Sequence, residues 1–474
     1  MNDVDVSNTV DGKPIYYWVG EHDRTVPLDA GYIGLVKCSN ITVQNVNVSN
    51  NEQGILLVNT TDSAISQNNI ANNDYGIDLQ LSCSNNSISG NDLTNNRNGI
   101  VLSSSGNNSI SGNSISVSLT AGICLSSSNN NSIVCNNMTH NGFGIALCDS
   151  SSNNIVSRNN ISSDNLDGIT LTFSSSHNSI LGNSIDANNG YGVSLWGSCD
   201  NNRISGNNIT SNSYGIGLGS SSSNSFIHNS FMSNTQQVQS DNSTNTWDDG
   251  YPSGGNYWSD YAGNDTYSGL YQNETGSDGI GDTLYIADLN SKDHYPLMKT
   301  WSPPDAAVFL LATLKTIIGQ GFTEIVSVTF ENQGNKIEVF NITVYANSNI
   351  IHSDQIMLET ASRTLNFVWN TTGFAYGNYT MSAYAAPLPE EEDVADNNCT
   401  SNIPVHVGVP GDVSGVVLGD PDGKCDMRDI NYVLTLFNTY PSSSNWKPNS
   451  DINNDGTVNF RDIQIAILNF GKHE

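Results

Sequence analysis

The residues best suited to chemistry stand near the end of the printed sequence, where oxygen-bearing side chains recur at alternate positions. The stretch begins at Asp451, Gly456 follows five residues later, and an apolar run with helical periodicity follows Asp462. A hard cation needs several oxygen ligands around it, and a glycine at the sixth position permits the sharp turn between them. The spacing therefore predicts a calcium loop with the ligands Asp451, Asn453, Asp455, Thr457 (through its backbone carbonyl), Asn459 and Asp462.

A looser copy of this loop precedes it. Counting back eleven residues from Asp429 reaches Leu418, which cannot bind a cation. If this loop contains an insertion, Asp412 can take the position of the first ligand. The ligands predicted for this half are Asp412, Asp420, Asp422, Lys424, Asp426 and Asp429.

The duplicated loop and helix resemble a dockerin-type calcium module. Asp stands at position 12 of each loop, as in dockerins, where EF-hands have Glu. The resemblance implies Ca²⁺ as cofactor and a cohesin-like protein as partner. The residues that it places at the partner surface are Met427 and Arg428 in one half, and Phe460 and Arg461 in the other.

Before these loops, a glycine followed by an aliphatic residue recurs every 22 to 24 residues. The glycines are Gly54, Gly76, Gly99, Gly122, Gly144, Gly168, Gly192 and Gly215. Each unit carries three short apolar segments with period two, which predicts three strands a turn rather than paired helices. The fold class expected is mainly β: a right-handed parallel β-helix, a β-sandwich, and a small α-helical calcium-loop module.

Asparagine columns support this register. One column runs through Asn86, Asn108, Asn131, Asn154, Asn178, Asn202 and Asn224, and the other through Asn68, Asn91, Asn113, Asn136, Asn159, Asn183, Asn207 and Asn229. Coils stack about 4.8 Å apart, so aligned Asn side chains can hydrogen-bond from coil to coil. We therefore assign these residues to the scaffold.

The repeats, together with Trp247 to Met298, resemble NosD-like β-helix proteins of the "carbohydrate-binding proteins and sugar hydrolases" type. Residues 254–261 (GGNYWSDY), 276–283 (GSDGIGDT) and 293–298 (DHYPLM) carry the resemblance beyond the coils. The segment after the coils is predicted to cap the last one. A cation held by some of Asp260, Asp265, Asp278 and Asp282 is the alternative.

A candidate active site lies on the β-helix. His140 and Asp164 both lie four residues before a repeat glycine, in neighbouring coils, and Asp167 lies one before Gly168. Glycosidases use paired carboxyl groups, so these three are candidate catalytic residues. Candidate sugar-stacking residues near the same column are Tyr75, Phe143, Tyr191 and Tyr214. The competing interpretation is a set of scattered polar residues on an exposed face.

Composition limits the partners. The 474 residues contain 16 Lys and Arg against 46 Asp and Glu, a net charge of -30, which disfavours nucleic acid. A surface rich in Asn, Ser, Thr and Gly suits neutral sugars and divalent cations. No apolar run is long enough to span a bilayer, and no signal peptide is visible at Met1, so we expect a leader missing from the sequence. The eight cysteines form no Cys-x-x-Cys pair.

The chain divides into five predicted parts: 1–30 as lead-in or incomplete first coil, 31–235 as β-helix, 236–301 as acidic cap, 305–408 as β-sandwich, and 409–474 as calcium module. Residues 377–380 (GNYT) and 396–398 (DNN) resemble the cell-adhesion-related immunoglobulin-like domain called CARDB. We expect an extracellular or cell-surface protein that binds polysaccharide through its β-helix. If the candidate catalytic residues are functional, it also cleaves the polysaccharide. A non-catalytic adhesin or structural protein is the alternative, and an exported copper-maturation factor is the third.

Overall fold

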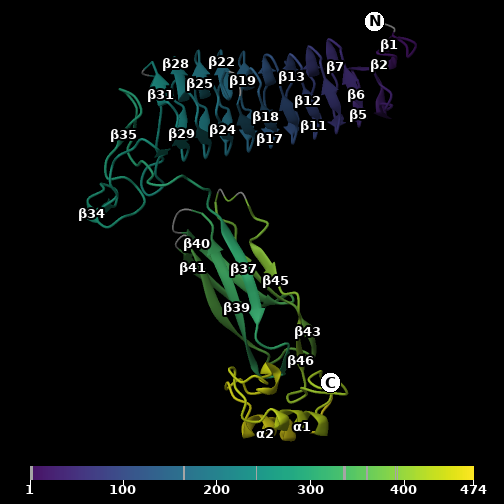
Figure 1. The fold of residues 1–474 in the computed structure, drawn as a ribbon, viewed down its shortest axis with the longest axis vertical. Coiled ribbons are helices and arrows are strands. Elements are labelled where there is room, and N and C mark those ends of the chain that lie inside the picture. The colour runs from purple at the N-terminus through teal and green to yellow at the C-terminus, as the bar shows by residue number, and fades with distance from the viewer. Residues whose placement is uncertain are drawn as a thin grey trace. The chain divides into compact units, whose positions relative to one another are not determined.

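The computed structural model describes residues 4–163, 166–241, 243–334, 338–358, 361–389, 391 and 393–474. The chain forms two compact units, Met1–Trp301 and Ser302–Glu474. Figure 1 shows the coils of the first unit and the strands and helices of the second.

Over its described residues, the first unit winds into coils that add strands to three long sheets. The first sheet contains, in spatial order, β1 Thr9–Val10, β2 Lys13–Val19, β4 Tyr32–Val36, β7 Gln53–Val58, β10 Tyr75–Gln80, β13 Asn98–Ser103, β16 Ala121–Ser126, β19 Phe143–Cys148, β22 Ile169–Thr172, β25 Tyr191–Trp196, β28 Tyr214–Gly219 and β31 Gln236–Ser240. Its strands are parallel except for β1, which pairs antiparallel with β2.

The other two long sheets complete each coil. The second contains β3 His22–Thr25, β5 Ser39–Gln44, β8 Ala64–Ser66, β11 Ser87–Ser89, β14 Ser109–Ser111, β17 Ser132–Val134, β20 Ile155–Ser157, β23 Ser179–Leu181, β26 Arg203–Ser205 and β29 Ser225–Ile227. The third contains β6 Asn47–Ser49, β9 Asn69–Ala71, β12 Asp92–Thr94, β15 Ser114–Ser116, β18 Asn137–Thr139, β21 Asn160–Ser162, β24 Ser184–Asp186, β27 Asn208–Thr210, β30 Ser230–Met232 and β32 Tyr257–Trp258. The predicted parallel β-helix is thus confirmed.

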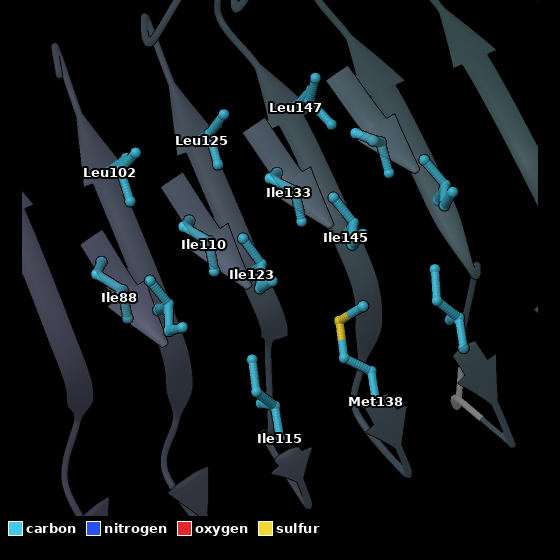
Figure 2. Close-up of a cluster of buried hydrophobic side chains, with 14 of the residues drawn as sticks. Ile88, Leu102, Ile110, Ile115, Ile123, Leu125, Ile133, Met138, Ile145 and Leu147 are labelled. Carbon is cyan, nitrogen blue, oxygen red and sulfur yellow. The ribbon is translucent and has the colours of Figure 1, made fainter. Parts of the chain in front are cut away.

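The core of the β-helix is built from columns of identical positions. Ile88, Ile110 and Ile133 pair in register across β11, β14 and β17, and all three are fully buried. Figure 2 shows these columns, with Met138 following Ile115 in the third sheet. Each buried aliphatic side chain stabilises the fold by about 1.5–3 kcal/mol. Because every coil repeats the same pattern, the core continues without a break along the array.

The repeated glycine is required by close approach of successive coils. A Cβ placed on Gly54 would lie 2.8 Å from the carbonyl oxygen of Gly76 and 2.9 Å from Cγ2 of Ile70. A Cβ on Gly76 would likewise lie 2.6 Å from the carbonyl oxygen of Gly99. Any side chain here would push the coils apart, so the glycine spacing marks the tightest point of each turn.

The predicted asparagine columns are continuous hydrogen-bonded ladders. The backbone N of Asn113 donates to Oδ1 of Asn136 at 3.0 Å, and Nδ2 of Asn113 donates to the same oxygen at 2.9 Å. Nδ2 of Asn136 in turn donates to the carbonyl oxygen of Ile110 and to Oδ1 of Asn159, both at 3.0 Å. Each amide therefore satisfies backbone and side-chain groups of neighbouring coils inside the turn.

Two further columns were not predicted as ladders. A third asparagine column includes Asn73 and Asn96, where Nδ2 of Asn73 donates to Oδ1 of Asn96 at 3.0 Å. In a hydroxyl column, the backbone N of Ser105 donates to Oγ of Ser128 at 3.1 Å. Cys38, Cys83 and Cys199 occupy the hydroxyl column as buried small residues.

Residues 236–301 cover the last coil with aromatic rings. Trp247 stacks on Phe226 and Trp258 stacks on Phe231, each pair with centroids 4.4 Å apart. Both tryptophans are at most 1% exposed. The segment also contains the short antiparallel pairs β33 Tyr267–Ser268 with β34 Glu274–Thr275, and β35 Tyr285–Ile286 with β36 Lys292–Asp293. These rings shield the core end that an open last coil would expose.

Over its described residues, the second unit contains three smaller sheets and two α-helices. The sheets are β37 Ala306–Thr313, β39 Thr323–Asn332 and β42 Ser362–Asn370; β38 Ile317–Gly319, β46 Val405–Gly408 and β43 Gly377–Tyr379; and β41 Asn349–Leu358, β40 Glu338–Ala346, β44 Met381–Ala385 and β45 Asn398–Thr400. Pairing is antiparallel except between β38 and β46. The helices are α1 Met427–Thr435 and α2 Phe460–Leu468, with a 3-10 turn at Pro448–Ser450.

Asp293 in the cap makes the stability of the first unit depend on pH. The carboxyl group is fully buried and accepts from the backbone N of Asn256 and from Nε1 of Trp258, both at 2.8 Å. Burial outweighs these bonds and raises the pKa of Asp293 to about 7. The folded state then binds this proton more tightly than the unfolded state. Stability is therefore highest below the unfolded pKa near 4 and is lost as the pH rises to about 7.

We predict that Asp293→Asn flattens this pH dependence. The stability of wild type should fall by up to about 4 kcal/mol between about pH 4 and pH 8, while that of the variant changes much less. Thermal unfolding of the full chain across this range measures the slope. Asp249→Asn, an exposed change in the same segment, is the control. Equal slopes in Asp293→Asn and wild type would contradict the assignment.

Candidate functional site

An aromatic shelf lies on the outer face of the first sheet, near the C-terminal end of the coils. It consists of Tyr191, Trp196 and Tyr214, from strands β25 and β28. The rings of Tyr191 and Tyr214 stack with centroids 4.9 Å apart, and Trp196 meets Tyr191 edge-on at 5.8 Å. All three side chains are partly exposed. Such rings offer flat apolar faces to a ligand from solvent.

Two glycines of the next coil make room for the shelf. A Cβ on Gly217 would lie 2.5 Å from Cδ1 of Tyr191, and a Cβ on Gly219 would overlap the ring of Trp196. Residues with side chains occupy the aligned positions of earlier coils, such as Ser194 and Thr170. The hydroxyl of Tyr191 donates to Oε1 of Gln239 at 2.6 Å, which fixes the ring.

A buried polar group adjoins the shelf. Asp167 is 9% exposed and accepts from the backbone N of Tyr191 at 3.0 Å and from Oγ of Ser194 at 2.7 Å. Oγ of Ser194 lies 2.8 Å from Oγ1 of Thr170. Burial raises the pKa of Asp167, although the two hydrogen bonds oppose this shift. A carboxyl group with a raised pKa can hold or give up a proton under milder conditions than a free one.

Of the other predicted residues, Phe143 lies one coil before Asp167, whose carbonyl oxygen accepts from the backbone N of Gly144 at 3.1 Å, and the rest lie farther away. Tyr75 lies in the same column as Tyr191, several coils earlier. Asn98 and Ala121 follow it in that column before the next aromatic residue, Phe143, so the ring of Tyr75 has no aromatic neighbour there. His140 is exposed in the turn after β18, with a φ of 58°. Asp164 lies outside the described residues. The structure thus joins Asp167, Tyr191 and Tyr214, and it does not bring His140 or Tyr75 into this group.

Trp196, Ser194 and Thr170 were missed by the sequence reasoning. Their signal is the run Gly215-Ile216-Gly217-Leu218-Gly219, which has glycine at outward positions where other coils carry side chains. An outward glycine above a ring on the preceding coil indicates that the ring lies flat on it. Register analysis that follows outward positions as well as inward ones would have found the shelf.

The second predicted loop, around Asp451, forms a sharp turn at Gly456, the glycine expected at its sixth position. Gly456 has a φ of 84°, which side chains rarely adopt, and its N donates to Oδ2 of Asp451 at 2.8 Å. Asp462 is fully buried and accepts from the backbone N of Asn459 at 2.8 Å and of Asn453 at 3.2 Å. The first and last predicted ligands are therefore held by backbone groups of the loop itself.

In the first predicted loop, Asp412 is a buried acid whose Oδ1 accepts from the backbone N of Asp422 at 3.3 Å. It is 2% exposed, and its Oδ2 has no hydrogen-bond partner in the described part of the chain. Burial, and secondly the nearby charge of Asp429, raises the pKa of Asp412 to about 7. Such a carboxyl oxygen is well suited to a cation. Arg428 instead pairs with Asp422 at 3.0 Å and with Asp426 at 2.8 Å, so the protein's own cation contacts two predicted ligands.

No group of three or more His, Cys, Asp or Glu side chains is arranged to hold a metal ion within the described residues. The predicted calcium ligands also include asparagine side chains and a backbone carbonyl oxygen, which are not among these four residue types. In the cap, Asp265 accepts from Ser277 and Gly279, and Asp282 accepts from Thr266. These carboxylates order the cap loops, which favours the structural role of the cap over a cation site.

Cys124 and Cys148 meet on the outer face of the first sheet, a contact that the sequence reasoning missed. They lie on the paired strands β16 and β19, where Cys148 is opposite Ser126. The interaction between the two thiols lowers the pKa of Cys148 and raises that of Cys124. All eight cysteines, each within the described residues, are free.

These features define a parallel β-helix protein with an aromatic outer shelf, followed by a second unit with three small sheets and two helices. The family model described as "Periplasmic copper-binding protein (NosD)" matches residues 6–162 and 149–263, which together make 258 of the 474 residues. The chain therefore belongs to the NosD family. A search of curated proteins found no match.

Several solved structures are similar at low identity. A point mutant of the periplasmic alginate epimerase AlgG is 18% identical, over 44% of this chain and 59% of that one, with a TM-score of 0.35. DFA-IIIase from Arthrobacter chlorophenolicus A6 is 18% identical over 46% of this chain and 54% of that one, with a TM-score of 0.31. The CARDB domain of a Pyrococcus furiosus protein, solved with two metal ions, is 21% identical over 23% of this chain and 99% of that one, with a TM-score of 0.21. The chain thus spans about six-tenths of the length of the epimerase.

No helix among the described residues is long and apolar enough to cross a membrane.

Proposed function

We propose that this chain is an exported protein whose β-helix binds a neutral polysaccharide on the aromatic shelf. The observation that carries the proposal is the stacked pair Tyr191 and Tyr214 beside the buried Asp167–Ser194 hydrogen bond. Aromatic faces contact the apolar faces of a sugar ring, and adjacent carboxyl and hydroxyl groups bind its hydroxyls. The net charge of -30 favours an uncharged glycan over a polyanionic one.

Cleavage of the glycan is the finer proposal. Asp167, with its raised pKa, is suited to protonate a leaving oxygen as a general acid. Hydrolysis needs a second carboxyl group, and Asp164 keeps that role only as a sequence-based proposal. If no cleavage occurs, the shelf makes the protein an adhesin, which is the alternative that we retain.

For the second unit, we propose an immunoglobulin-like β-sandwich followed by a dockerin-like calcium module. The buried carboxyl groups of Asp412, Asp429, Asp451 and Asp462 support this proposal. Bound calcium would neutralise these carboxylates and fix the loops beside α1 and α2. The exposed side chains of Met427 and Phe460, 54% and 68% exposed at equivalent positions, would then face a cohesin-like partner.

Copper maturation is the third candidate, suggested by the description of the family. The observation in its favour is the contact between Cys124 and Cys148, because thiolates are preferred ligands of Cu(I). The shelf has no role in this candidate function, so we rank it below glycan binding.

We predict that Tyr191→Ala weakens glycan binding at least about tenfold. The ring would leave the shelf, and an apolar side chain of this size contributes about 1.5–3 kcal/mol when covered. A glycan array first selects the ligand of the full chain, and calorimetry with that ligand then gives the affinity of each variant.

Tyr75→Ala is the matched control, since Tyr75 occupies the same column several coils away. Equal affinity of Tyr191→Ala and wild type would rule out the shelf as the binding site. An enzyme should release reducing ends from the glycan, and Asp167→Asn should abolish this release while still binding the glycan. An adhesin should release none.

We predict that calcium stabilises the second unit and that Asp455→Ala reduces this effect. A ligand at a thousand times its dissociation constant raises the free energy of unfolding by about 4 kcal/mol. Thermal unfolding of the full chain with calcium and with a chelator measures the effect. Asp354→Ala removes an equal, exposed charge from the β part and is the control. An unfolding transition unmoved by calcium would refute the calcium module.

A further inference from the structure

A lysine from the β part of the second unit is buried against the second calcium loop. Lys315 lies between β37 and β38 and is 2% exposed. Its Nζ donates to the backbone carbonyl oxygen of Asp451, the first predicted ligand of the loop. Lysine is seldom buried without a charged partner, so this position needs an explanation.

Burial lowers the pKa of Lys315, and the charges of carboxyl groups from both parts of the unit oppose that shift. Asp451, Glu324 and Asp462 all act on the charge of Lys315, and all three are at most 3% exposed. Glu324 holds the lysine backbone in place, because its Oε1 accepts from the N of Leu314 and of Lys315, both at 2.9 Å. Lys315 thus places a positive charge near Asp451 and Asp462, two predicted ligands whose charge calcium would otherwise neutralise.

Further hydrogen bonds attach the same loop region to the β part. The backbone N of Thr316 donates to Oδ1 of Asn449 at 3.1 Å, and Nδ2 of Asn449 donates to Oγ1 of Thr316 at 3.1 Å. Nδ2 of Asn454, inside the loop, donates to the carbonyl oxygen of Thr323 at 2.8 Å. The loop is therefore docked by the bond from Lys315 to Asp451 and by bonds made by Asn449 and Asn454, which lie before and after Asp451 in the sequence.

We infer that Lys315 is a built-in cation that docks the second calcium loop onto the β part of the unit and competes with calcium for that loop. The inference rests on the proposed calcium module and adds its regulation. Calcium brings two positive charges to carboxylates that Lys315 already faces, so the two cations repel each other. Coupling between two binding events is reciprocal: docking weakens calcium binding, and calcium loosens docking.

Calcium titration of the full chain, with Lys315→Met compared with wild type, tests the inference. Removing the ammonium group should tighten calcium binding at one site by about tenfold or more. Hydrogen exchange of the 314–324 segment should rise on adding calcium in wild type, and should already be high without calcium in the variant. Lys447→Met, which removes an exposed positive charge four residues before Asp451, should change neither quantity by more than about twofold.

Asn449→Ala provides a second variant that leaves the charges intact. It breaks the bonds to Thr316 and should also tighten calcium binding, by a smaller factor, because docking is weaker. If Lys315 merely pre-organised the loop, both variants would bind calcium more weakly, and that result would overturn the inference. Equal affinity in Lys315→Met and wild type would overturn it as well. If the wild type binds no calcium, the proposed calcium module itself is wrong. If the wild type and Lys315→Met bind calcium equally well, only the inference about Lys315 is wrong.

Discussion

Hydrogen bonding between buried asparagines is the interaction on which the β-helix depends. Each coil turns between strands three times, and every turn leaves backbone N–H and C=O groups inside the protein. Unpaired groups there would each cost about 1–3 kcal/mol. Amides such as Asn136 carry a donor and an acceptor on one side chain, so one residue pairs with the coils on both sides. The repeated glycines allow the close approach of these coils, since a Cβ on Gly76 would lie 2.6 Å from the carbonyl oxygen of Gly99.

A rigid, repeating scaffold leaves function to the positions where the repeat is broken. The shelf forms where two outward positions, Gly217 and Gly219, have no side chain. The rings of Tyr191 and Trp196 from the preceding coil lie over these glycines. Asp167 differs from the rest of its column by being a buried acid among aromatic and polar residues. In the second unit, which has no such repeat, the unusual residue is the buried Lys315, whose side chain contacts the loop at Asp451. Each deviation costs local stability unless it has a partner, and each has one.

The sequence predicted the scaffold well because one rule repeats many times. Glycine spacing, inward aliphatics such as Ile77 and Leu79, and two ladders followed from period and register, and the structure agrees. The site was harder, since it depends on outward neighbours in different coils. Trp196 shares strand β25 with Tyr191 and lies opposite Gly219, at an outward position that the inward period does not mark. Cys124 and Cys148 lie diagonally across two paired strands. Lys315 was invisible for the same reason: it lies 136 residues from Asp451 along the chain.

The most direct test of this account replaces one ladder residue and its neighbour separately. Asn136→Ala leaves Asn113, Ile110 and Val134 without their partner groups, so the β-helix should lose about 3 kcal/mol or more. Asn137→Ala, at the adjacent exposed position, should change stability by about 0.5 kcal/mol or less. Urea unfolding of the full chain, followed by far-ultraviolet circular dichroism, measures both. Equal stability of the two variants would contradict the claim that buried asparagine ladders hold the coils together.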